Sequence, residues 1–481
     1  MNYKKEDLLQ QPVFAYFNEI CQIPHVSGNE KQLSDHLLSW AKNLGLDAAQ
    51  DKYHNLYIRK PAAPGYEDAP PIMLQAHIDM VGDQTADSTL NFQTDPIKWI
   101  VEGDNITTGG KTTLGADDGI GVAMAMAVLA DKSLHHPMLE VAFTTMEEVD
   151  FSGAVHFHFP IQSNSLINLD GAVDHEILCS SSGGMDANVR LPVQYEAVPQ
   201  ENIGLRVALS GFAGGHSGKE INRGRDNAIA VLGRFLLELK KEIPFTISHL
   251  QGGTSYISLS RDAWAELSLK PEDVHTVEEA VQNLQNIMLE EHPVTGKGIH
   301  VTCSQSQRPE KAVQPESIIT WLVLPTNGIV QMNEMFPNVV ASSVNLGLVR
   351  LEEDSLFLRF DIRSLPEHMG KFTFERLELL AQLTGASCTS TLSYPSWKLY
   401  AQSPLRERAV QVYEKKFSTK PEVTAVHCGL EVGYFFAQKP NLDAICIGPN
   451  RWGNHSPSEG MSIESVFRST DYLIQLLKEL K

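Results

Sequence analysis

Acidic residues and histidines recur at five separated points of the chain, each next to a short apolar run. In chain order the points are His77 with Asp79, Asp117 with Asp118, Glu147 with Glu148, Asp170, and His455. Histidine nitrogen and carboxylate oxygen are the ligands that hydrolytic zinc takes while keeping an open position. Two neighbouring metal ions need a carboxylate between them, and a further carboxylate must act as general base on water. These residue types together indicate a two-metal hydrolytic site.

Each point taken alone has an ordinary structural explanation. An isolated His-x-Asp is a common surface pattern, and Glu147-Glu148 could be a solvated helix start. Asp117 and Asp118 precede a helical pattern, where capping and the helix dipole favour acids. Asp170 precedes a glycine, as a turn residue often does. The functional interpretation therefore depends on all five points occurring together, in order and at strand ends.

Short apolar runs predict the elements that must position these side chains. The expected strands are 71–77, 138–145, 166–170 and 444–448, and the expected helices are 14–23, 31–44, 119–130 and 463–480. Strands that alternate with helices predict an α/β fold with a mostly parallel or mixed sheet. The carboxyl ends of such strands line the ligand crevice, so one edge of the sheet would collect the five points.

The middle of the chain follows a different pattern. Longer, alternating strands such as 204–209 and 355–364 are separated by helical stretches at 227–241, 276–290 and 371–384. We therefore expect an α+β domain, residues 187–390, inserted into a discontinuous catalytic domain formed by residues 1–186 and 391–481.

Composition and charge exclude several classes of function. The chain has 481 residues, 42% of them hydrophobic and 20% charged, which is typical of a globular protein. Lys and Arg number 39 against 59 Asp and Glu, a formal net charge of −20. Such an acidic surface argues against binding to nucleic acid or to anionic lipid. No apolar run is long enough to span a bilayer, and no secretory signal is recognisable, so we expect a cytoplasmic protein.

The motifs resemble those of the M20 metallopeptidases. The order H-x-D, G-A-D-D-G, E-E, strand-Asp, G-G-H-S-G and N-H-S-P extends over nearly the whole chain. Spacing and the long middle domain are similar to the bacterial aminoacyl-histidine (Xaa-His) dipeptidases. The resemblance implies a zinc-peptidase-like mixed sheet flanked by helices, with an inserted α+β domain that serves as lid and dimerisation domain.

The resemblance also implies a role for each residue. His77 and Asp170 would hold one zinc ion, Glu148 and His455 the other, and Asp117 would bridge the two, with a cis bond expected between Asp117 and Asp118. Further implied roles concern catalysis: Glu147 as general base, Asp79 as the residue that orients His77, and His216 as the inserted-domain residue that polarises the scissile carbonyl. Cobalt or manganese would also suit these ligands.

Four further residues are candidates for binding the substrate. Arg363 resembles a lid arginine that grips a substrate carboxylate, a task that suits a forked guanidinium; a strand-end ion pair is the alternative. Asn333 and Asn345 would border the same pocket, with capping or turn roles as the alternative. Glu431 lies in a segment that resembles a substrate-binding stretch of the family.

The resemblance implies a metal-dependent dipeptidase that hydrolyses Xaa-His and other unblocked dipeptides by attack of a dizinc-bound hydroxide. An N-acyl amino acid amidohydrolase, either an aminoacylase or a deacetylase, is the alternative, because it would use the same metal site. A binding protein without catalysis is disfavoured because the proposed base and ligands are all present. We expect a homodimer, and the sequence leaves open whether His216 serves its own chain or the neighbouring one.

Overall fold

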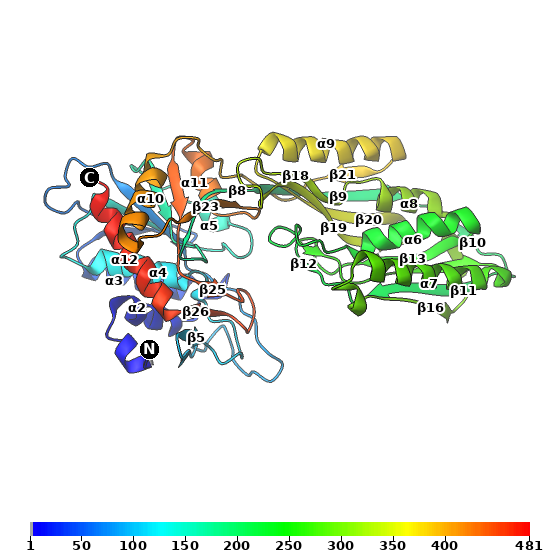
Figure 1. Ribbon diagram of the computed structural model, residues 1–481, viewed down its shortest axis with the longest axis horizontal. Coiled ribbons are helices and arrows are strands. Elements are labelled where there is room, and N and C mark those ends of the chain that lie inside the picture. The colour runs from blue at the N-terminus through cyan, green and yellow to red at the C-terminus, as the bar shows by residue number, and fades with distance from the viewer. Residues whose placement is uncertain (1–2) are drawn as a thin grey trace. The chain divides into compact units, whose positions relative to one another are not determined.

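The computed structural model describes residues 3–481. The chain divides into two compact units. Unit 1 comprises residues up to Ser180, Trp397–Ala425 and Leu430–Lys481, and unit 2 comprises Ser181–Ser396 and Val426–Gly429. Figure 1 labels several elements of each unit. No helix among the described residues is both long and apolar enough to cross a membrane.

Unit 1 is built on an eight-stranded mixed sheet. In spatial order its strands are β1 (Asp47–Gln50), β2 (Leu56–Lys60), β6 (Leu139–Thr144), β3 (Ile72–His77), β7 (Ser165–Asn168), β24 (Asp443–Cys446), β8 (Glu176–Ser181) and β23 (Glu422–Val426). A small second sheet contains β25 (Arg451–Trp452), β26 (Gly460–Ser462), β5 (Asn105–Thr107) and β4 (Ile100–Glu102). The α/β fold with a mixed sheet predicted from the sequence is confirmed.

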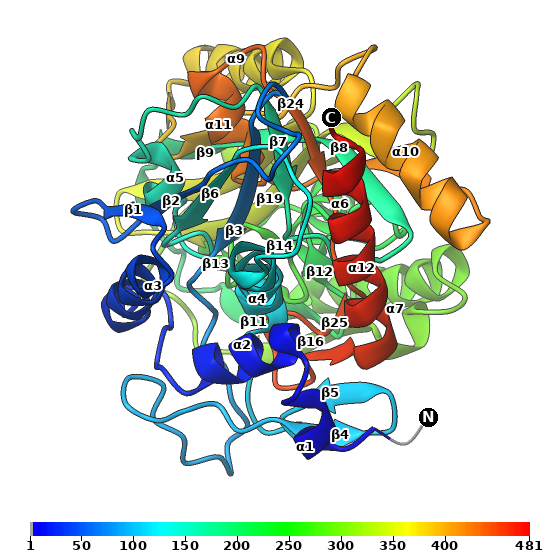
Figure 2. The same cartoon turned by 90° about the vertical axis from the view of Figure 1, so that its left-hand side faces the viewer.

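The helices of unit 1 account for much of its core. They are α1 (Lys5–Leu8), α2 (Pro12–Cys21), α3 (Lys31–Asn43), α4 (Ala116–Ala130), α5 (Ser152–Val155), α10 (Pro404–Phe417), α11 (Val432–Gln438) and α12 (Ile463–Glu479). Helix α4 is apolar on all sides and almost entirely buried, as expected of a helix inside a core. It packs on β3 and against α2 and α12, and Figure 2 shows these helices in front of the sheet.

The register of the parallel strands brings their carboxyl ends to one edge. His77 on β3 pairs with Thr144 on β6, and Gln75 pairs with Asn168 on β7. Asn168 in turn pairs with Cys446 on β24. The residues that follow these four strands therefore emerge side by side. This is the edge at which ligands bind in open α/β sheets.

Unit 2 is an antiparallel sheet with helices. Its main strand path is β16 (His300–Ser306), β11 (Ile203–Ser210), β15 (Ala263–Leu269), β13 (Thr246–Gly252), β19 (Val340–Leu351), β20 (Ser355–Ser364), β9 (Gly183–Pro192) and β21 (Ser387–Thr389). Shorter strands are β10 (Tyr195–Ala197), β12 (Gly215–His216), β14 (Ser258–Leu259), β17 (Lys311–Val313), β18 (Gly328–Met332) and β22 (Ser393–Tyr394).

Four helices complete the core of unit 2. They are α6 (Ala228–Glu242), α7 (Val274–Glu291), α8 (Pro315–Val323) and α9 (Glu367–Thr384). Helix α6 packs against α7, α8 and the sheet, whereas α9 lies along β9, β20 and β21 (Figure 1). The strands and helices expected in the middle of the chain are all present, because their apolar periodicity matches the face that each element buries.

Candidate metal centre and substrate residues

Strand β3 delivers His77 and Asp79 to the carboxyl edge of the sheet. His77 is buried, and its Nδ1 lies 3.0 Å from the backbone oxygen of Asp79 and 3.4 Å from Asp79 Oδ1. The Asp79 carboxylate also accepts the backbone N–H groups of Glu147 and Glu148, at 3.0 and 3.1 Å, and the Ser27 hydroxyl at 2.8 Å. Asp79 thus fixes the turn that carries both glutamates as well as facing the His77 ring.

The Asp117 turn is shaped by backbone geometry. Gly115 has φ 71°, a conformation that glycine adopts without strain, and the Asp117–Asp118 peptide bond is cis, as the resemblance implies. The carboxylate of Glu459 accepts the backbone N–H groups of Leu114, Gly115 and Asp117 at 2.7 to 3.1 Å. The turn is therefore held in place from a loop more than 300 residues later in the chain.

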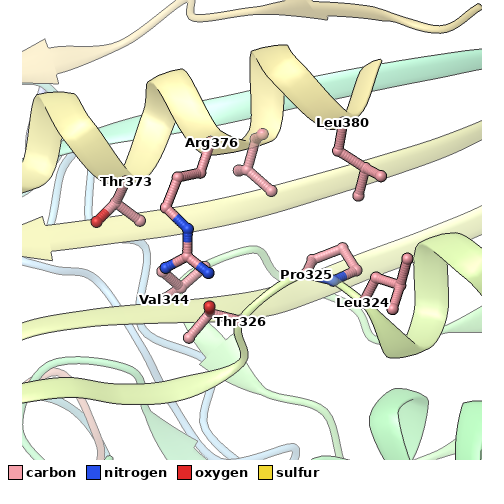
Figure 3. A pocket seen from close by; sticks show the side chains of 8 residues that line it. Leu324, Pro325, Thr326, Val344, Thr373, Arg376 and Leu380 are labelled. Carbon is pink, nitrogen blue, oxygen red and sulfur yellow. The ribbon is translucent and has the colours of Figure 1, made fainter. Parts of the chain in front are cut away.

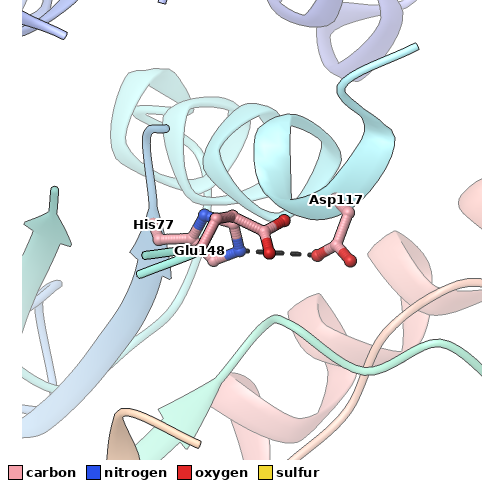
Figure 4. A group of neighbouring side chains, drawn as sticks. All are labelled: His77, Asp117 and Glu148. Atoms are coloured by element: carbon pink, nitrogen blue, oxygen red, sulfur yellow. Dashed lines mark ion pairs between the residues drawn. The ribbon is translucent and has the colours of Figure 1, made fainter. Parts of the chain in front are cut away.

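Asp117 lies between two pairs of side chains, His77 with Asp170 and His455 with Glu148. Figure 4 shows Asp117 with His77 and Glu148. Its Oδ1 is 3.4 Å from His77 Nε2, and its Oδ2 is 3.4 Å from His455 Nε2. His77 Nε2 lies 4.0 Å from Asp170 Oδ2, and His455 Nε2 lies 2.9 Å from Glu148 Oε2. The structure thus brings together the five residues singled out as metal ligands, with the central carboxylate in the middle.

Two groups of ligand atoms in this cluster are close enough to hold a metal ion. One consists of His77, Asp117 and Glu148 and the other of His77, Asp118 and Asp170, with the atoms of each group within 4.8 Å of one another. His77 Nε2 and Glu148 Oε1 are buried and make no hydrogen bond with any described residue. Buried polar atoms are nearly always paired, so these two atoms fit a site that a metal ion completes.

Burial and charge shift the pKa values within the cluster. Burial raises the pKa of Glu147 well above its ordinary value, and the negative charges of Glu148 and Asp170 raise it further, against the effect of His77. For His455, hydrogen bonds to Asp117 and Glu148 outweigh burial and raise the pKa to about 10. The site therefore concentrates negative charge in a place of low polarity, which favours binding of cations.

Arg451 is a member of the cluster that the sequence pattern did not single out. Its side chain is 1% exposed, and its guanidinium contacts Asp117, Asp170 and Asp118. Three positions after Arg451, Asn454 donates a hydrogen bond through Nδ2 to Asp117 Oδ2 at 2.5 Å. Both residues lie within four positions of His455, and that proximity is the signal in the sequence that could have identified them.

Glu431 lies beneath the cluster in a second polar layer. Its Oε2 accepts hydrogen bonds from Gln75 Nε2 and Thr144 Oγ1, both at 2.6 Å, and Gln75 Oε1 accepts from Asn168 Nδ2 at 2.5 Å. Burial raises the pKa of Glu431 to about 8, against the effects of His77 and of these hydrogen bonds. Glu431 thus links the strands that precede His77, Glu147 and Asp170, from within unit 1.

His216 lies in unit 2 on the short strand β12. Its Nδ1 accepts the backbone N–H groups of Gly218 and Lys219 at 3.0 and 3.1 Å, so the neutral ring carries its proton on Nε2. A side chain at Gly218 would collide with the backbone oxygen of His427, which explains a glycine at this position. The histidine is thereby held as a hydrogen-bond donor through Nε2.

Arg363 is also in unit 2, on β20, and is buried. Its Nε donates to Asp361 Oδ2 at 2.8 Å, and the Ser217 hydroxyl donates to the same oxygen at 2.5 Å. The side chain of Ser217 therefore ties the segment of His216 to the arginine. This ion pair leaves the two terminal nitrogens of the guanidinium as the donors that do not bind Asp361.

Asn345 and Asn333 are engaged in local structure. Asn345 is 1% exposed, its Nδ2 donates to the backbone oxygens of Tyr256 and Ser258, and its Oδ1 accepts from Asn227. Asn333 accepts the backbone N–H groups of two residues in the turn after β18. These bonds support a turn role for Asn333, whereas Asn345, in the middle of β19, holds the loop of Tyr256 and Ser258 against that strand.

Comparison with known proteins is consistent with this arrangement. Residues 73–479 match the model of peptidase family M20/M25/M40, so the chain belongs to that family. It is 35% identical over 477 residues, 98% of both chains, to the cytosol non-specific dipeptidase of Escherichia coli strain K12.

Solved structures extend the comparison. The aminoacylhistidine dipeptidase of Vibrio alginolyticus superposes with a TM-score of 0.87 at 31% identity, covering 99% of this chain and 98% of that one. The aminopeptidase PepT of Bacillus cereus ATCC 10987 has a TM-score of 0.56 at 15% identity, covering 98% of both chains, and shares the fold.

Proposed function

We propose that this protein is a metal-dependent dipeptidase that cleaves Xaa-His dipeptides and other unblocked dipeptides. The observation that carries the proposal is the cluster at the carboxyl edge of the sheet formed by His77, His455, Asp117, Asp118, Glu148 and Asp170. In this cluster His77 Nε2 and Glu148 Oε1 are buried without a hydrogen-bond partner among the described residues. Family membership supports the hydrolysis of peptide bonds, and the full-length similarity to two dipeptidases supports the substrate class.

We propose the ligand assignment that the family resemblance implies, and the distances in the cluster support it. His77 and Asp170 would hold one divalent ion, Glu148 and His455 the other, and Asp117 would contribute one oxygen to each. Ions bound there supply Lewis acidity, which polarises a carbonyl and makes water acidic enough to lose a proton near neutral pH. Zinc suits a mixed histidine and carboxylate set, and cobalt or manganese would also be accepted.

Glu147 is the proposed proton carrier. Its backbone N–H is fixed by Asp79, and its raised pKa suits a group that takes a proton from water and returns it to the leaving amine. Asp79 would at the same time hold the His77 ring in its orientation.

We propose that unit 2 contributes the residues that bind the peptide. His216 would donate through Nε2 to the carbonyl under attack, because its Nδ1 is already an acceptor. Arg363 would bind the terminal carboxylate of the substrate with the guanidinium nitrogens that Asp361 leaves available. Unit 1 would then be the catalytic domain and unit 2 the inserted domain.

A homodimer formed through unit 2 is part of the proposal. Phe372, Leu379 and Leu383 on α9 are exposed to solvent. Their spacing places all three on one side of the helix, where they form an apolar surface. Beside them, the pocket of Figure 3 is lined by Leu324, Pro325, Thr326, Val344, Thr373, Arg376, Leu377 and Leu380. Exposed apolar surface of this kind is typical of self-association sites. Light scattering would show a dimer that Leu383→Glu converts to a monomer; an unaltered protein that is monomeric would contradict this part.

A cytoplasmic location is also proposed, in line with the name of the Escherichia coli relative.

A panel of substrates tests the activity. Ala-His, β-Ala-His, Leu-Gly, a tripeptide and an N-acetyl amino acid would be assayed before and after chelation, and again after zinc is restored. Cleavage of the dipeptides that chelation abolishes and zinc restores is the expected result. Cleavage of the acetylated compound alone would identify an N-acyl amino acid amidohydrolase instead. Absence of hydrolysis despite bound zinc would contradict both activities.

A further inference from the structure

Arg451 places a fixed positive charge inside the candidate metal centre. Nη1 donates to the backbone oxygen of Ala116 and to Asp117 Oδ1, both at 3.0 Å. Nη2 donates to the backbone oxygen of Asp170 at 2.9 Å and to Asp170 Oδ1 at 2.7 Å. All four hydrogens of these two nitrogens are therefore used, half of them on backbone. The fold itself anchors the guanidinium, in addition to the carboxylates.

Arg451 contacts only one carboxylate oxygen of Asp170 and one of Asp117. Arg451 takes Asp170 Oδ1 and leaves Oδ2, which lies 4.0 Å from His77 Nε2. It also contacts Asp117 Oδ1, the oxygen 3.4 Å from His77 Nε2, whereas Asp117 Oδ2 points to His455. Arg451 thus shares both acids on the His77 side of the cluster. It leaves Asp170 Oδ2 to face His77, whereas both oxygens of Asp117 accept a hydrogen bond, Oδ1 from Arg451 and Oδ2 from Asn454.

The other side of the cluster is paired with a histidine instead of an arginine. Among the ion pairs of the described residues, Glu148 has one with His455 and none with an arginine or lysine. A permanent guanidinium charge repels a divalent ion more strongly the closer the ion is, and little solvent screens that repulsion in a buried site. The two metal positions therefore experience different electrostatic fields.

We propose that Arg451 makes the two metal positions unequal, so that the position formed by His77 and Asp170 binds a divalent ion more weakly and fills second. The inference rests on the proposed ligand assignment. Arg451 acts here as a positioning residue: it orients one oxygen of Asp170 toward His77, and its charge sets the affinity of that position. Occupancy of the second position would then respond to the supply of free zinc.

The test measures zinc binding directly, without substrate. Metal-free full-length protein is titrated with zinc in competition with a coloured chelator, which yields two dissociation constants per chain. We expect constants that differ at least tenfold, with Asp170→Asn removing the weaker step and sparing the tighter one. This comparison needs no change at Arg451. Equal constants in the unaltered protein, or loss of the tighter step in Asp170→Asn, would overturn the inference and leave the dipeptidase proposal intact.

Substitution of the arginine sharpens the test. In Arg451→Gln we expect the weaker dissociation constant to fall at least tenfold and the tighter one to change less than threefold. Arg359→Gln is the matched control, because it removes an arginine that pairs with a buried aspartate, Asp186, in unit 2. An Arg451→Gln protein whose weaker constant is unchanged or raised would overturn the inference. A lack of zinc uptake by the unaltered protein would overturn the ligand assignment and the inference together.

Discussion

Units 1 and 2 bury acidic side chains with very different numbers of partners. In unit 2, Asp186 is fully buried and accepts hydrogen bonds from the side chains of Asn188, Arg359, Ser390 and Thr391 and from the backbone N–H groups of Thr391 and Leu392. In unit 1, Asp118 is equally buried, yet neither of its oxygens accepts a hydrogen bond from the described residues.

The difference separates a structural acid from a functional cluster. A buried carboxylate surrounded by donors stabilises the ionised form, and for Asp186 these donors outweigh burial and hold the pKa at about 2. In the cluster of unit 1, burial instead raises the pKa values of Glu147, Glu148 and Asp170. Both oxygens of Asp118 and Oε1 of Glu148 are buried and accept no hydrogen bond from the described residues, which suits binding of a cation, whereas the fully paired Asp186 holds the fold together.

The largest expected effect is on catalysis in unit 1. Glu147→Gln removes the proposed proton carrier but keeps the shape of the side chain, so kcat should fall about 1,000-fold. Zinc content measured by atomic absorption should stay normal. Glu148→Gln is the matched comparison, because the neighbouring glutamate is a proposed ligand and its variant should lose bound zinc. Near-normal turnover in Glu147→Gln would reject the assignment of the base.

The next effect concerns stability in unit 2. Asp186→Ala leaves Arg359 and several backbone N–H groups without their partner, so the free energy of unfolding should fall by about 3 kcal/mol. Urea unfolding measures this change. Asp47→Ala, which breaks an exposed pair with Arg59, should cost less than about 1 kcal/mol. Similar losses of unfolding free energy in the two variants would contradict the structural role assigned to Asp186.

The pH dependence of stability should have opposite signs at Asp186 and Glu431. Glu431 has a folded pKa of about 8, above its unfolded value, so its protonated form stabilises the fold at low pH. That contribution is lost as pH rises from about 5 to 8. Glu431→Gln should therefore reduce the decline in unfolding free energy of the metal-free protein over this range by about 2 kcal/mol.

For Asp186 the folded pKa lies below the unfolded value, so its contribution is present above about pH 4 and declines as pH falls toward 2. Asp186→Asn should flatten the stability profile on that acidic side alone. Urea midpoints across the pH range report both changes. A Glu431→Gln profile parallel to that of the unaltered protein would contradict the buried, protonated state inferred for Glu431.

The smallest effect is expected at an exposed acidic cluster. His175, Glu176 and Glu422 also bring ligand atoms together, but His175 and Glu422 are exposed to solvent. Water screens and satisfies such groups, so we expect Glu422→Gln to leave the amount of bound zinc unchanged. Loss of a zinc equivalent in this variant would show that burial is not what distinguishes the cluster at the sheet edge.

The sequence could predict the strands and the main acidic residues because both follow simple local rules. Apolar runs locate β3, β6 and β7. His77 is the last residue of β3, and Glu147, Glu148 and Asp170 follow within four residues of the ends of β6 and β7. Parallel strands place their ends at one edge, so position in the chain translates into position in space. Helix α4 was equally evident, since an apolar stretch of small residues packs inside a core.

The contacts of Arg451 and Glu459 could not be predicted in this way. Both lie in the irregular segment around β25 and β26, where the direction of a side chain depends on turn geometry and has no period. Asn345 illustrates the converse difficulty: its residue type suits a binding site, but three hydrogen bonds engage it within unit 2. Partners distant in sequence decide such roles, and periodicity carries no information about them.

The division of the chain limits how the molecule can be taken apart. Unit 2 includes the short return segment Val426–Gly429, where His427 Nε2 lies 2.7 Å from the hydroxyl of Ser343. A single deletion of residues 181–396 would remove most of unit 2 but leave Val426–Gly429 behind in the remaining chain. Recombination or grafting that exchanges this unit between relatives must therefore transfer two pieces of gene, and an exchange of one piece would combine most of unit 2 with a mismatched His427.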